Sequence, residues 1–210
     1  NNQVVAMTGD GVNDAPALKQ SNIGVAMGIT GTAVSKEAAD IVLTDDNFAS
    51  IVAAVEEGRR VYDNLIKSLV FVLPTNLGLA MILMAAVIFF PFLLNPSTGL
   101  KELLLPMAPT QLLWINLVAT VALALPLAFE AKEPNVMQRP PRSPDAPVLS
   151  GFVITRTFVA ATLMTIGAVG LFLWEYHANG ETVDAMRKGQ TMAVTTVIMF
   201  QVFYVLNCRS

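Results

Sequence analysis

Residues 68–100, SLVFVLPTNLGLAMILMAAVIFFPFLLNPSTGL, contain no charged side chain. A hydrocarbon core about 30 Å thick requires roughly 20 apolar residues in a helix, so this run is long enough to cross a membrane. Three similar runs follow, because 103–129 and 190–208 are free of charge and 152–174 holds a single charge, Arg156. The sequence therefore predicts about four membrane-spanning helices. Their approximate limits are 67–92, 103–129, 152–175 and 190–208.

The composition agrees with a chain made of two unlike parts. Hydrophobic residues make up 54% of the 210 residues and charged residues 14%, which is apolar for a soluble domain. Lysine and arginine gather before the first apolar run and between the second and third. By the positive-inside tendency, this distribution places residues 1–67 and 130–151 in the cytoplasm. We expect an integral multi-pass protein of the plasma membrane. A single cysteine, Cys208, excludes a disulfide framework and a cysteine-based metal site within these residues.

Residues 1–64 predict a different kind of structure, with short strands and helices in alternation. Short β-branched runs predict the strands and are separated by helix-like segments. The strands are expected at 4–7, 23–27 and 41–43, and the helices from 14, at 34–39 and at 48–64. Such alternation favours an α/β domain with a parallel sheet. The predicted division is thus an α/β part at 1–64, followed by an α-helical transmembrane domain at 65–210, with helix 48–64 running on into the first span as one long helix or a helix pair.

A polar loop, TGDGVND, follows the first predicted strand at residues 8–14. In an open α/β sheet, ligands collect at the carboxyl ends of the strands, where this loop is expected to lie. Gly9 and Gly11 allow the backbone to turn tightly and to approach a ligand closely. The loop therefore predicts a binding site rather than only a strand–helix turn with an aspartate cap.

Three polar side chains of this loop carry the expected chemistry. Asp10 and Asp14 are hard oxygen ligands suited to Mg²⁺, which usually takes one or two carboxylates together with phosphate oxygens. Asn13 can donate a hydrogen bond to a phosphoryl oxygen. We therefore expect a site for a magnesium-bound phosphate group.

With its neighbours, this loop resembles the phosphorylation domain of the P-type ATPases, a branch of the haloacid-dehalogenase superfamily. The matching segments are MTGDGVNDAPAL at 7–18, GVAMG at 24–28, GTA at 31–33, DDNF at 45–48 and VEEGR at 55–59. Two further segments, QLLWIN at 111–116 and MQRPPRSP at 137–144, are similar to the type II pumps, the calcium-pump side of that family. The resemblance covers nearly the whole chain.

The resemblance implies a Rossmannoid phosphorylation domain and an ATP-driven cation pump, a translocase. It assigns Mg²⁺ to Asp10, completes the phosphate pocket with Asn13 and Asp14, and gives Gly9 and Gly11 to the cofactor-binding backbone. The implied reaction is phosphoryl transfer from Mg·ATP to an aspartate, followed by hydrolysis. The family's Asp-Lys-Thr-Gly-Thr motif, its nucleotide-binding domain, its dephosphorylation loop and its first four spans are not in these residues. We therefore expect ATP to be bound mainly by upstream domains, and this fragment not to hydrolyse ATP alone.

Polar residues inside the spans are candidates for the cation site, because the bilayer makes them costly. The first span carries Pro74 and Asn76, and the proline frees backbone carbonyls that can face an ion. The second carries Asn116 and Thr120 on one face of the helix, and the fourth carries Gln201. The alternative role of such side chains is hydrogen bonding between helices.

Comparison with the calcium pumps argues against copying calcium to this chain. By the resemblance, three of their membrane carboxylates correspond to Leu79, Thr120 and Gln201. A dehydrated Ca²⁺ requires six to eight oxygens and usually several negative charges. Neutral amides and hydroxyls suit a monovalent cation better, although the missing fourth span could supply a carboxylate.

Three other functions remain open from the residues. The loop at 8–14 alone would fit a soluble phosphatase of the same superfamily, but four predicted spans argue against it. A non-catalytic membrane protein, derived from a pump by truncation or by loss of its carboxylates, is the second alternative, and absence of an upstream Asp-Lys-Thr-Gly-Thr motif would support it. A P-type lipid flippase is a further alternative, because neutral intramembrane sites also occur there.

Overall fold

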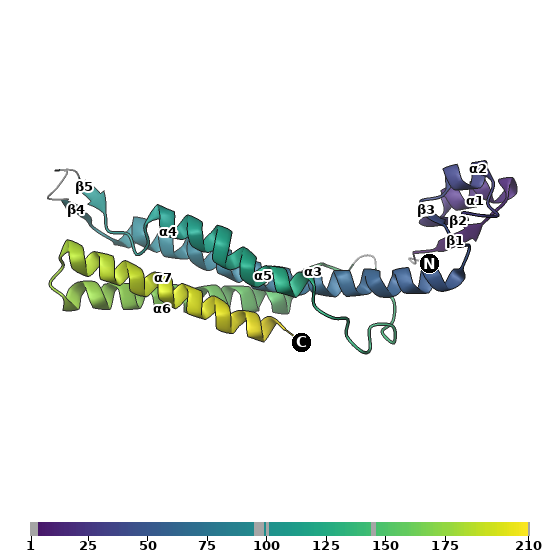
Figure 1. The fold of residues 1–210 in the computed structure, drawn as a ribbon. Helices are drawn as coiled ribbons and strands as arrows, with labels where there is room; N and C mark the ends of the chain where they lie inside the picture. The colour runs from purple at the N-terminus through teal and green to yellow at the C-terminus, as the bar shows by residue number, and fades with distance from the viewer. Residues whose placement is uncertain (1–3, 95–98, 100, 144–145, 210) are drawn as a thin grey trace. The chain divides into compact units, whose positions relative to one another are not determined.

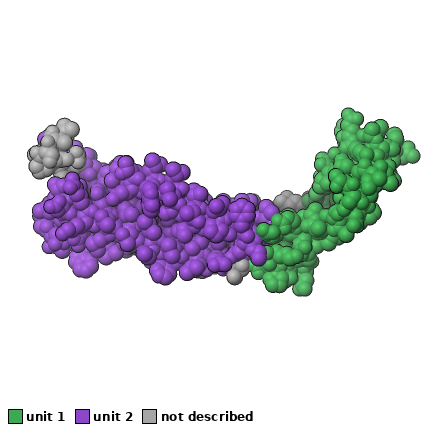
Figure 2. Space-filling view, viewed as in Figure 1, with its two compact units in different colours: residues 1–60, 132–147 green, residues 61–131, 148–210 purple. Residues whose placement is uncertain are grey.

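The computed structural model describes residues 4–94, 99, 101–143 and 146–209. The chain forms two compact units, shown in green and purple in Figure 2. Unit 1 comprises residues 1–60 and 132–147, and unit 2 comprises residues 61–131 and 148–210. The segment 132–147 thus belongs to unit 1, although it lies between two apolar runs in the sequence. The functional division at residue 64 remains a prediction.

A small parallel sheet forms the centre of unit 1, as predicted. Strands β1 (Ala6–Gly9), β2 (Ile23–Met27) and β3 (Ile41–Leu43) are paired in that order and all run parallel. Parallel neighbours require crossovers, and here helices α1 (Ala15–Gln20) and α2 (Ala33–Ala38) supply them (Figure 1). The carboxyl ends of all three strands consequently lie at one edge of the sheet.

The core of this unit is small and covers only part of the sheet. Helix α1 packs against β2, and Leu18 of α1 and Val25 and Ala26 of β2 are buried. By contrast, the large apolar side chains of Ile23 and Ile41 are 38% and 47% exposed, although each lies in a strand. Unit 1 therefore leaves apolar strand residues without cover.

The segment after the sheet forms one continuous helix, α3 (Phe48–Phe89), rather than a helix pair. Pro74 lies inside it and cannot donate to the carbonyl of Val70, one turn earlier. The hydroxyl of Tyr204, from another helix of unit 2, donates to that carbonyl at 3.4 Å. The Thr75 hydroxyl also bonds to the carbonyl of Phe71 at 3.1 Å. These partners allow the helix to continue through the proline.

Four helices of the described residues are long and apolar enough to cross a membrane, as predicted. They are Phe48–Phe89, Pro109–Ala128, Gly151–Ala178 and Val183–Cys208. The second is built from α4 (Pro109–Trp114), the π-helical segment η2 (Ile115–Thr120) and α5 (Val121–Ala128), and the last two are α6 (Gly151–Ala178) and α7 (Val183–Cys208).

Two helix starts differ from the predicted limits. The second membrane helix begins at Pro109 instead of 103, because β5 (Lys101–Leu103) pairs antiparallel with β4 (Phe92–Leu94) and uses the preceding residues in a hairpin. Helix α7 begins at Val183 instead of 190, because the Thr182 hydroxyl caps it by accepting a hydrogen bond from the Ala185 amide at 3.1 Å. The charge-free run located the apolar part of α7, whereas the Thr182 cap sets the residue at which the helix begins.

Unit 2 is held together by close packing of its helices. A buried cluster joins Ile82 of α3 to Met164 and Phe172 of α6 and Val197 of α7. A second buried cluster surrounds Phe71 of α3. It includes Leu127 near the end of α5, Ala160 of α6 and Tyr204 near the end of α7. Helices α6 and α7 lie side by side along their length (Figure 1). Packing of this kind, rather than hydrophobic segregation from water, drives helix association in a bilayer.

Candidate functional site

Strand β1 ends at Gly9 rather than at the predicted residue 7, so Thr8 and Gly9 of the TGDGVND segment lie in the strand. The chain then enters α1 through a single 3₁₀ turn, Val12–Asp14. The Oδ2 atom of Asp14 accepts hydrogen bonds from the backbone amides of Asp10 at 3.1 Å and Gly11 at 3.0 Å. A Cβ atom at Gly9 would lie 2.5 Å from the Cβ atom of Asp14, closer than side chains approach each other. Asp14 therefore folds the loop back on itself, and Gly9 is required for that closure.

A pocket of about 470 Å³ opens beside this loop, at the carboxyl ends of the strands. It brings together Gly9, Asp10 and Asp14 from the predicted set. Gly11 and Asn13 are not among its lining residues, and the side chain of Asn13 is exposed. The complete lining is Thr8, Gly9, Asp10, Asp14, Met27, Thr30, Asp46 and Phe48. No role was predicted for Thr30 or Asp46, although Asp46 lies in the segment DDNF, 45–48, which resembles the family.

The carboxylate oxygens in this pocket suit a magnesium ion whose other ligands are phosphate oxygens. Asp10 is exposed, and within the described ranges its carboxylate makes no hydrogen bond. Asp14 already uses Oδ2 to hold the loop. The described residues contain no group of three or more histidine, cysteine or acidic side chains that could enclose a metal alone. Mg²⁺ usually takes one or two carboxylates plus phosphate and water oxygens, which is what Asp10 and its neighbours could provide.

In unit 2, two of the predicted cation-site residues lie in direct contact. The Nε2 atom of Gln201 donates to the hydroxyl of Thr120 at 3.2 Å, and that hydroxyl donates to the carbonyl of Ile115 at 3.1 Å. Thr120 is 3% exposed and Gln201 is fully buried. The Oε1 atom of Gln201 is also buried and has no hydrogen-bond partner among the described residues. An acceptor in this condition is costly unless a cation, a water or a donor meets it.

The helix around Thr120 is itself irregular. Residues Ile115–Thr120 form the π-helical segment η2. The side-chain hydroxyl of Thr120 donates to the carbonyl of Ile115, five residues earlier, instead of the usual four. Such π-helical insertions occur frequently at functional sites, because they shift backbone groups out of the regular ladder. The irregular segment and the unsatisfied acceptor of Gln201 therefore mark the same place in unit 2.

The other two predicted cation-site residues do not join this pair. Asn76 and Asn116 are both exposed on unit 2, and neither side chain makes a hydrogen bond with a described residue. The expectation that Pro74 leaves a carbonyl for an ion also needs correction. The freed carbonyl of Val70 accepts from the Tyr204 hydroxyl, because this turn of α3 lies against α7.

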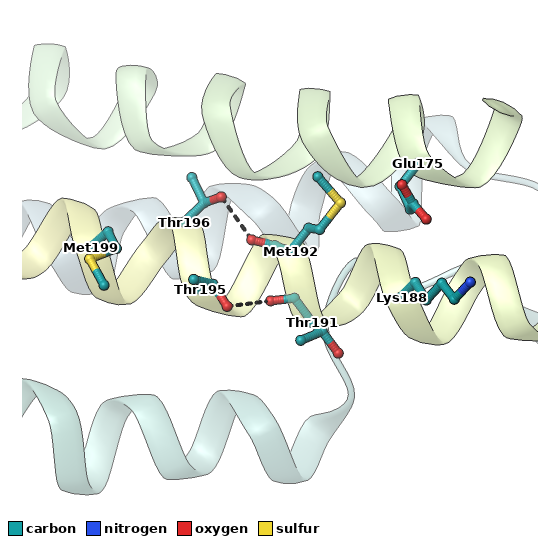
Figure 3. Close-up of a pocket in the computed structure, with 7 residues that line it drawn as sticks. All are labelled: Glu175, Lys188, Thr191, Met192, Thr195, Thr196 and Met199. Carbon is teal, nitrogen blue, oxygen red and sulfur yellow. Dashed lines mark hydrogen bonds between the residues drawn. The ribbon is translucent and has the colours of Figure 1, made fainter. Parts of the chain in front are cut away.

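A second pocket, of about 700 Å³, runs along α7 and is drawn in Figure 3. Its threonine hydroxyls donate hydrogen bonds within α7. Thr195 donates to the carbonyl of Thr191 at 2.8 Å and Thr196 to that of Met192 at 2.7 Å. Glu175 and Lys188 lie at one end and Met199 at the other. Because these hydroxyl protons are donated within the helix, the threonines of this pocket give no sign of a ligand site.

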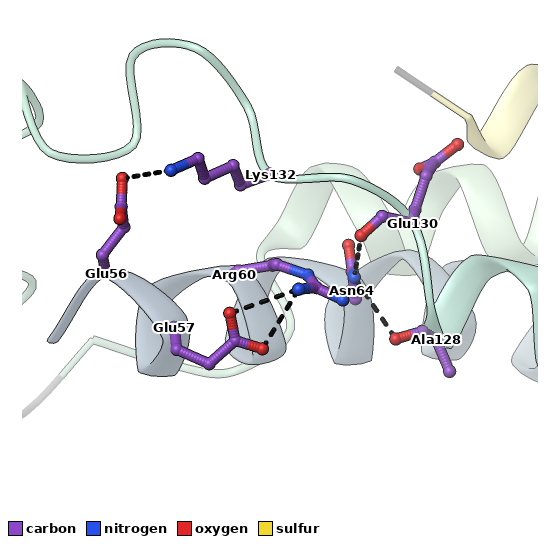
Figure 4. Close-up of polar contacts among 7 residues, drawn as sticks. All are labelled: Glu56, Glu57, Arg60, Asn64, Ala128, Glu130 and Lys132. Carbon is purple, nitrogen blue, oxygen red and sulfur yellow. Dashed lines mark hydrogen bonds and ion pairs between the residues drawn. The ribbon is translucent and has the colours of Figure 1, made fainter. Parts of the chain in front are cut away.

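In unit 1, the first turns of α3 bind the segment 132–147. Lys132 pairs with Glu56 at 2.7 Å, as Figure 4 shows. The Nη1 atom of Arg59 donates to the carbonyls of Val136 at 2.8 Å and Arg139 at 2.9 Å. Val136 is only 2% exposed. The segment is thus held on α3 by side chains that reach its backbone.

In unit 2, polar side chains gather just after the end of α5. The amide of Asn64 donates to the carbonyls of Ala128 at 3.3 Å and Glu130 at 2.8 Å, as drawn in Figure 4. The carboxylate of Glu130 pairs with Lys67 at 2.9 Å and with Arg209 at 3.0 Å. Burial alone would raise the pKa of Glu130, but the hydrogen bonds from Lys67 and Arg209 outweigh it and lower that pKa. Glu130 therefore connects α3, the end of α5 and the end of α7.

Comparison with known proteins shows the family to which the chain belongs. The family model "Cation transporting ATPase, C-terminus" matches residues 104–210. A probable cation-transporting ATPase F of Mycobacterium tuberculosis is 51% identical over 99% of this chain and 21% of the relative. Cation-transporting ATPase pma1 of Synechocystis is 43% identical over 97% of this chain and 21% of the relative, and a calcium-transporting ATPase of Bacillus subtilis is 40% identical over 100% and 22%. The chain spans about a fifth of the length of the curated relatives that it matches.

Proposed function

Because this chain belongs to the cation-transporting ATPase family, we propose that it carries the magnesium- and phosphate-binding loop and part of the cation path of a P-type pump. The observation that carries the proposal is the pocket at the carboxyl ends of three parallel strands, which brings Gly9, Asp10 and Asp14 together. Ligands collect at this edge in open α/β sheets. In the whole protein, the reaction would be phosphoryl transfer from ATP to an aspartate, followed by hydrolysis.

Within this loop, each side chain has a separate role. Asp10 would hold Mg²⁺, which when bound offsets negative charge on the transferring phosphoryl group. Asp14 keeps the amides of Asp10 and Gly11 in place, and the exposed Asn13 can donate to a phosphoryl oxygen. Preorganised groups of this kind supply most of the electrostatic effect in phosphoryl transfer.

We further propose that unit 1 is the end of a larger haloacid-dehalogenase-like domain. Its support is the exposed apolar side chains on both faces of the small sheet: Ile23 and Ile41 on one face are 38% and 47% exposed, and Val42 on the other is 41% exposed. Parallel sheets normally have both faces covered by helices, so these side chains would be buried in a longer sheet.

For the transported ion, we propose a monovalent cation bound near Thr120 and Gln201. This pair offers neutral oxygens, including the unsatisfied Oε1 atom of Gln201, and no carboxylate. Calcium is the second candidate, because several relatives are named calcium-transporting ATPases, among them the one from Bacillus subtilis. Asn76 and Asn116 would join the site only if spans of the longer protein cover them.

Transport requires that changes at the phosphate loop reach the membrane helices. We propose that α3 carries this coupling, because one continuous helix runs from Phe48 through Pro74 to Phe89. Arg59 would add the segment 132–147 to the same element. A rigid element whose position both sites bias is the physical basis of such coupling. The expected membrane is the plasma membrane, with residues 1–64 on the cytoplasmic side.

The test is ATP hydrolysis by the full-length protein in liposomes, titrated separately with K⁺, Na⁺, Ca²⁺, Mg²⁺ and Mn²⁺. A monovalent pump should be stimulated by K⁺ or Na⁺ with Mg²⁺ present. Strong stimulation by micromolar Ca²⁺ would instead establish calcium as the cargo and reject the argument from neutral ligands. A protein that forms no phosphoenzyme under any of these conditions would be a non-catalytic relative, and lipid-stimulated turnover without cation dependence would indicate a flippase.

Asp10→Asn tests the loop itself. The amide keeps the side chain's shape and removes the charge that would hold Mg²⁺, so phosphoenzyme formation should fall by about 100-fold or more. Asp184→Asn, in the first turn of α7 and outside the pocket, serves as the control and should change the rate little. An unchanged rate in Asp10→Asn would remove this residue from the magnesium role.

A further inference from the structure

The pocket wall opposite the loop at 8–14 is held by one carboxylate, that of Asp46. Its Oδ1 atom accepts from the backbone amides of Gly28 at 2.5 Å and Ile29 at 2.9 Å. Its Oδ2 atom accepts from the amide of Thr30 at 2.7 Å and from the hydroxyl of Thr30 at 2.8 Å. Three successive amides thus converge on one side chain, which is the arrangement by which a backbone nest binds an anion.

Asp46 is suited to this role by its backbone and its charge. It has a φ of 50°, a left-handed conformation that aspartate adopts more readily than most side chains. Burial alone would raise the pKa of Asp46, but hydrogen bonds from Ile29, Thr30 and Gly28 outweigh it and lower the pKa to about 2. The side chain is therefore a full anion at neutral pH, and charge-assisted hydrogen bonds to it are strong.

The segment that Asp46 holds is bonded at its other end to Asp10. The amide of Thr32 donates to the carbonyl of Asp10 at 2.8 Å. The hydroxyl of Ser35, a fully buried residue, donates to the same carbonyl at 2.9 Å. Residues 28–35 therefore form a bridge between the carboxylate of Asp46 and the backbone of Asp10.

This bridge has little room to shift. A Cβ atom at Gly28 would lie 2.3 Å from the carbonyl oxygen of Leu43, and one at Gly31 would lie 2.0 Å from that of Met27. The backbone thus packs directly on the ends of β2 and β3. Because the bridge is tight, the direction of the Asp10 backbone depends on the anchor at Asp46.

We propose that Asp46 is a positioning residue for the magnesium and phosphate pocket, acting through residues 28–35 on Asp10. The inference rests on the proposed function, since it assumes that Asp10 holds the ion. Thr30 and Asp46 line the same pocket as Asp10 and Asp14, so loss of the anchor would move one wall relative to the other. Neither residue needs to touch the ion or the phosphate for this effect.

The test compares Asp46→Asn with Asp45→Asn in the full-length protein. Asp45 is the neighbouring carboxylate, but it accepts from the Ser50 hydroxyl at 2.6 Å and the Asn47 amide at 3.2 Å, and it is not among the pocket's lining residues. Phosphoenzyme is measured against Mg²⁺ concentration at saturating ATP. Asp46→Asn should raise the Mg²⁺ concentration at half-saturation by about 10-fold, because small misplacements of a binding group have large effects, and Asp45→Asn should leave it unchanged.

Two further measurements keep the result clear. Thr30→Val removes only the hydroxyl bond to Asp46 and should shift the half-saturation in the same direction by about 2-fold to 3-fold. Amide hydrogen exchange of residues 28–35 should be faster in Asp46→Asn than in Asp45→Asn, because the protecting acceptor is weaker.

Each outcome decides between distinct claims. An unchanged Mg²⁺ concentration at half-saturation in Asp46→Asn would overturn the positioning role. A lower maximal phosphoenzyme level with the same half-saturation would overturn it too, because that result indicates only a loss of folded protein. If wild-type protein forms no phosphoenzyme, the proposed function fails. If wild type forms it and Asp10→Asn does not affect it, the assignment of Asp10 fails while the exchange result still reports on the bridge.

Discussion

Gln201 is one of two residues in the described chain with a buried side-chain polar atom that has no hydrogen-bond partner; the other is Ser68 of α3. Thr120 has a single proton, which it donates to Ile115, so it must accept the amide N–H of Gln201. That choice fixes the amide orientation and leaves Oε1 pointing into a buried space without a partner among the described residues. The same helix carries a satisfied counterpart, Gln190, whose Nε2 atom donates to the carbonyl of Leu105 at 3.0 Å.

We expect Gln201→Leu to leave the thermal stability of the full-length protein unchanged or slightly higher, because it removes an unsatisfied acceptor. The same change should abolish cation-stimulated ATP hydrolysis if Gln201 binds the ion. Gln190→Leu should instead lower stability by about 1 kcal/mol, because it leaves the Leu105 carbonyl without its donor. Thermal unfolding in detergent and cation titration measure the two effects. Loss of stability in Gln201→Leu with unaltered cation response would assign this residue to helix packing alone.

At the scale of elements, α3 uses glycine in two different ways. A Cβ atom at Gly78 would lie 2.1 Å from the Cε atom of Met164 and 3.4 Å from the carbonyl oxygen of Ala161, both on α6. At Gly58 the same atom would meet nothing within 4 Å. Gly78 therefore allows α3 and α6 to approach closely, whereas Gly58 is an exposed helix-interior glycine.

Substituting alanine at these two glycines should consequently change the free energy of unfolding in opposite directions. Gly78→Ala forces Met164 to move inside a packed interface and should lower stability by about 1 kcal/mol. Gly58→Ala should raise it by about 0.5–1 kcal/mol, because alanine restricts the unfolded chain and favours the helix. Thermal midpoints of the purified full-length variants test the pair. Equal shifts for both would show that the contact between α3 and α6 is not close-packed.

At the scale of the whole molecule, Glu130 links segments that are far apart in the sequence. It lies between Lys67 and Arg209, and its side chain is only 14% exposed. Its lowered pKa means that the ionised form favours the folded state. This stability is present above the unfolded-state pKa of about 4.3 and is lost as the pH falls through the folded-state pKa.

Glu130→Gln should therefore lower the thermal midpoint at pH 7, and the difference from wild type should shrink as the pH falls below about 4. Glu56→Gln is the matched control, since its pair with Lys132 is more exposed, with side-chain exposures of 34% and 53%. Exposed pairs contribute little, so this variant should have nearly the wild-type midpoint at every pH. A pH-independent loss in Glu130→Gln would indicate steric damage instead of a lost charge pair.

The sequence predicted which helices and strands exist more accurately than the residues at which they begin and end. Charge-free runs predicted four apolar helices, because their length and composition are local properties. The π-helical segment at 115–120 was not predicted, because no apolar or charge pattern distinguishes it from the helix around it. The start of α7 at Val183 was missed because the prediction followed the charge-free run, although the Thr182 cap that sets it is a local signal. The polar segment was expected at the end of a strand and lies there, although its first two residues belong to β1. Asn116 was grouped with Thr120 by their helical spacing and Asn76 by the resemblance, and both asparagines lie exposed in the structure.

By itself, the sequence determined that an α/β segment with a phosphate-type loop precedes four apolar helices, because hydrophobic length and short motifs are read along the chain. Only the tertiary structure decided which polar groups meet. Asp46 bonds Gly28, Ile29 and Thr30 across the sheet edge, and Gln201 meets Thr120 from another helix. These partners are 16 to 81 residues apart, so no local pattern records their contact. Such pairings follow from how helices and strands pack, which satisfies some polar atoms and leaves Oε1 of Gln201 without a partner in the described chain.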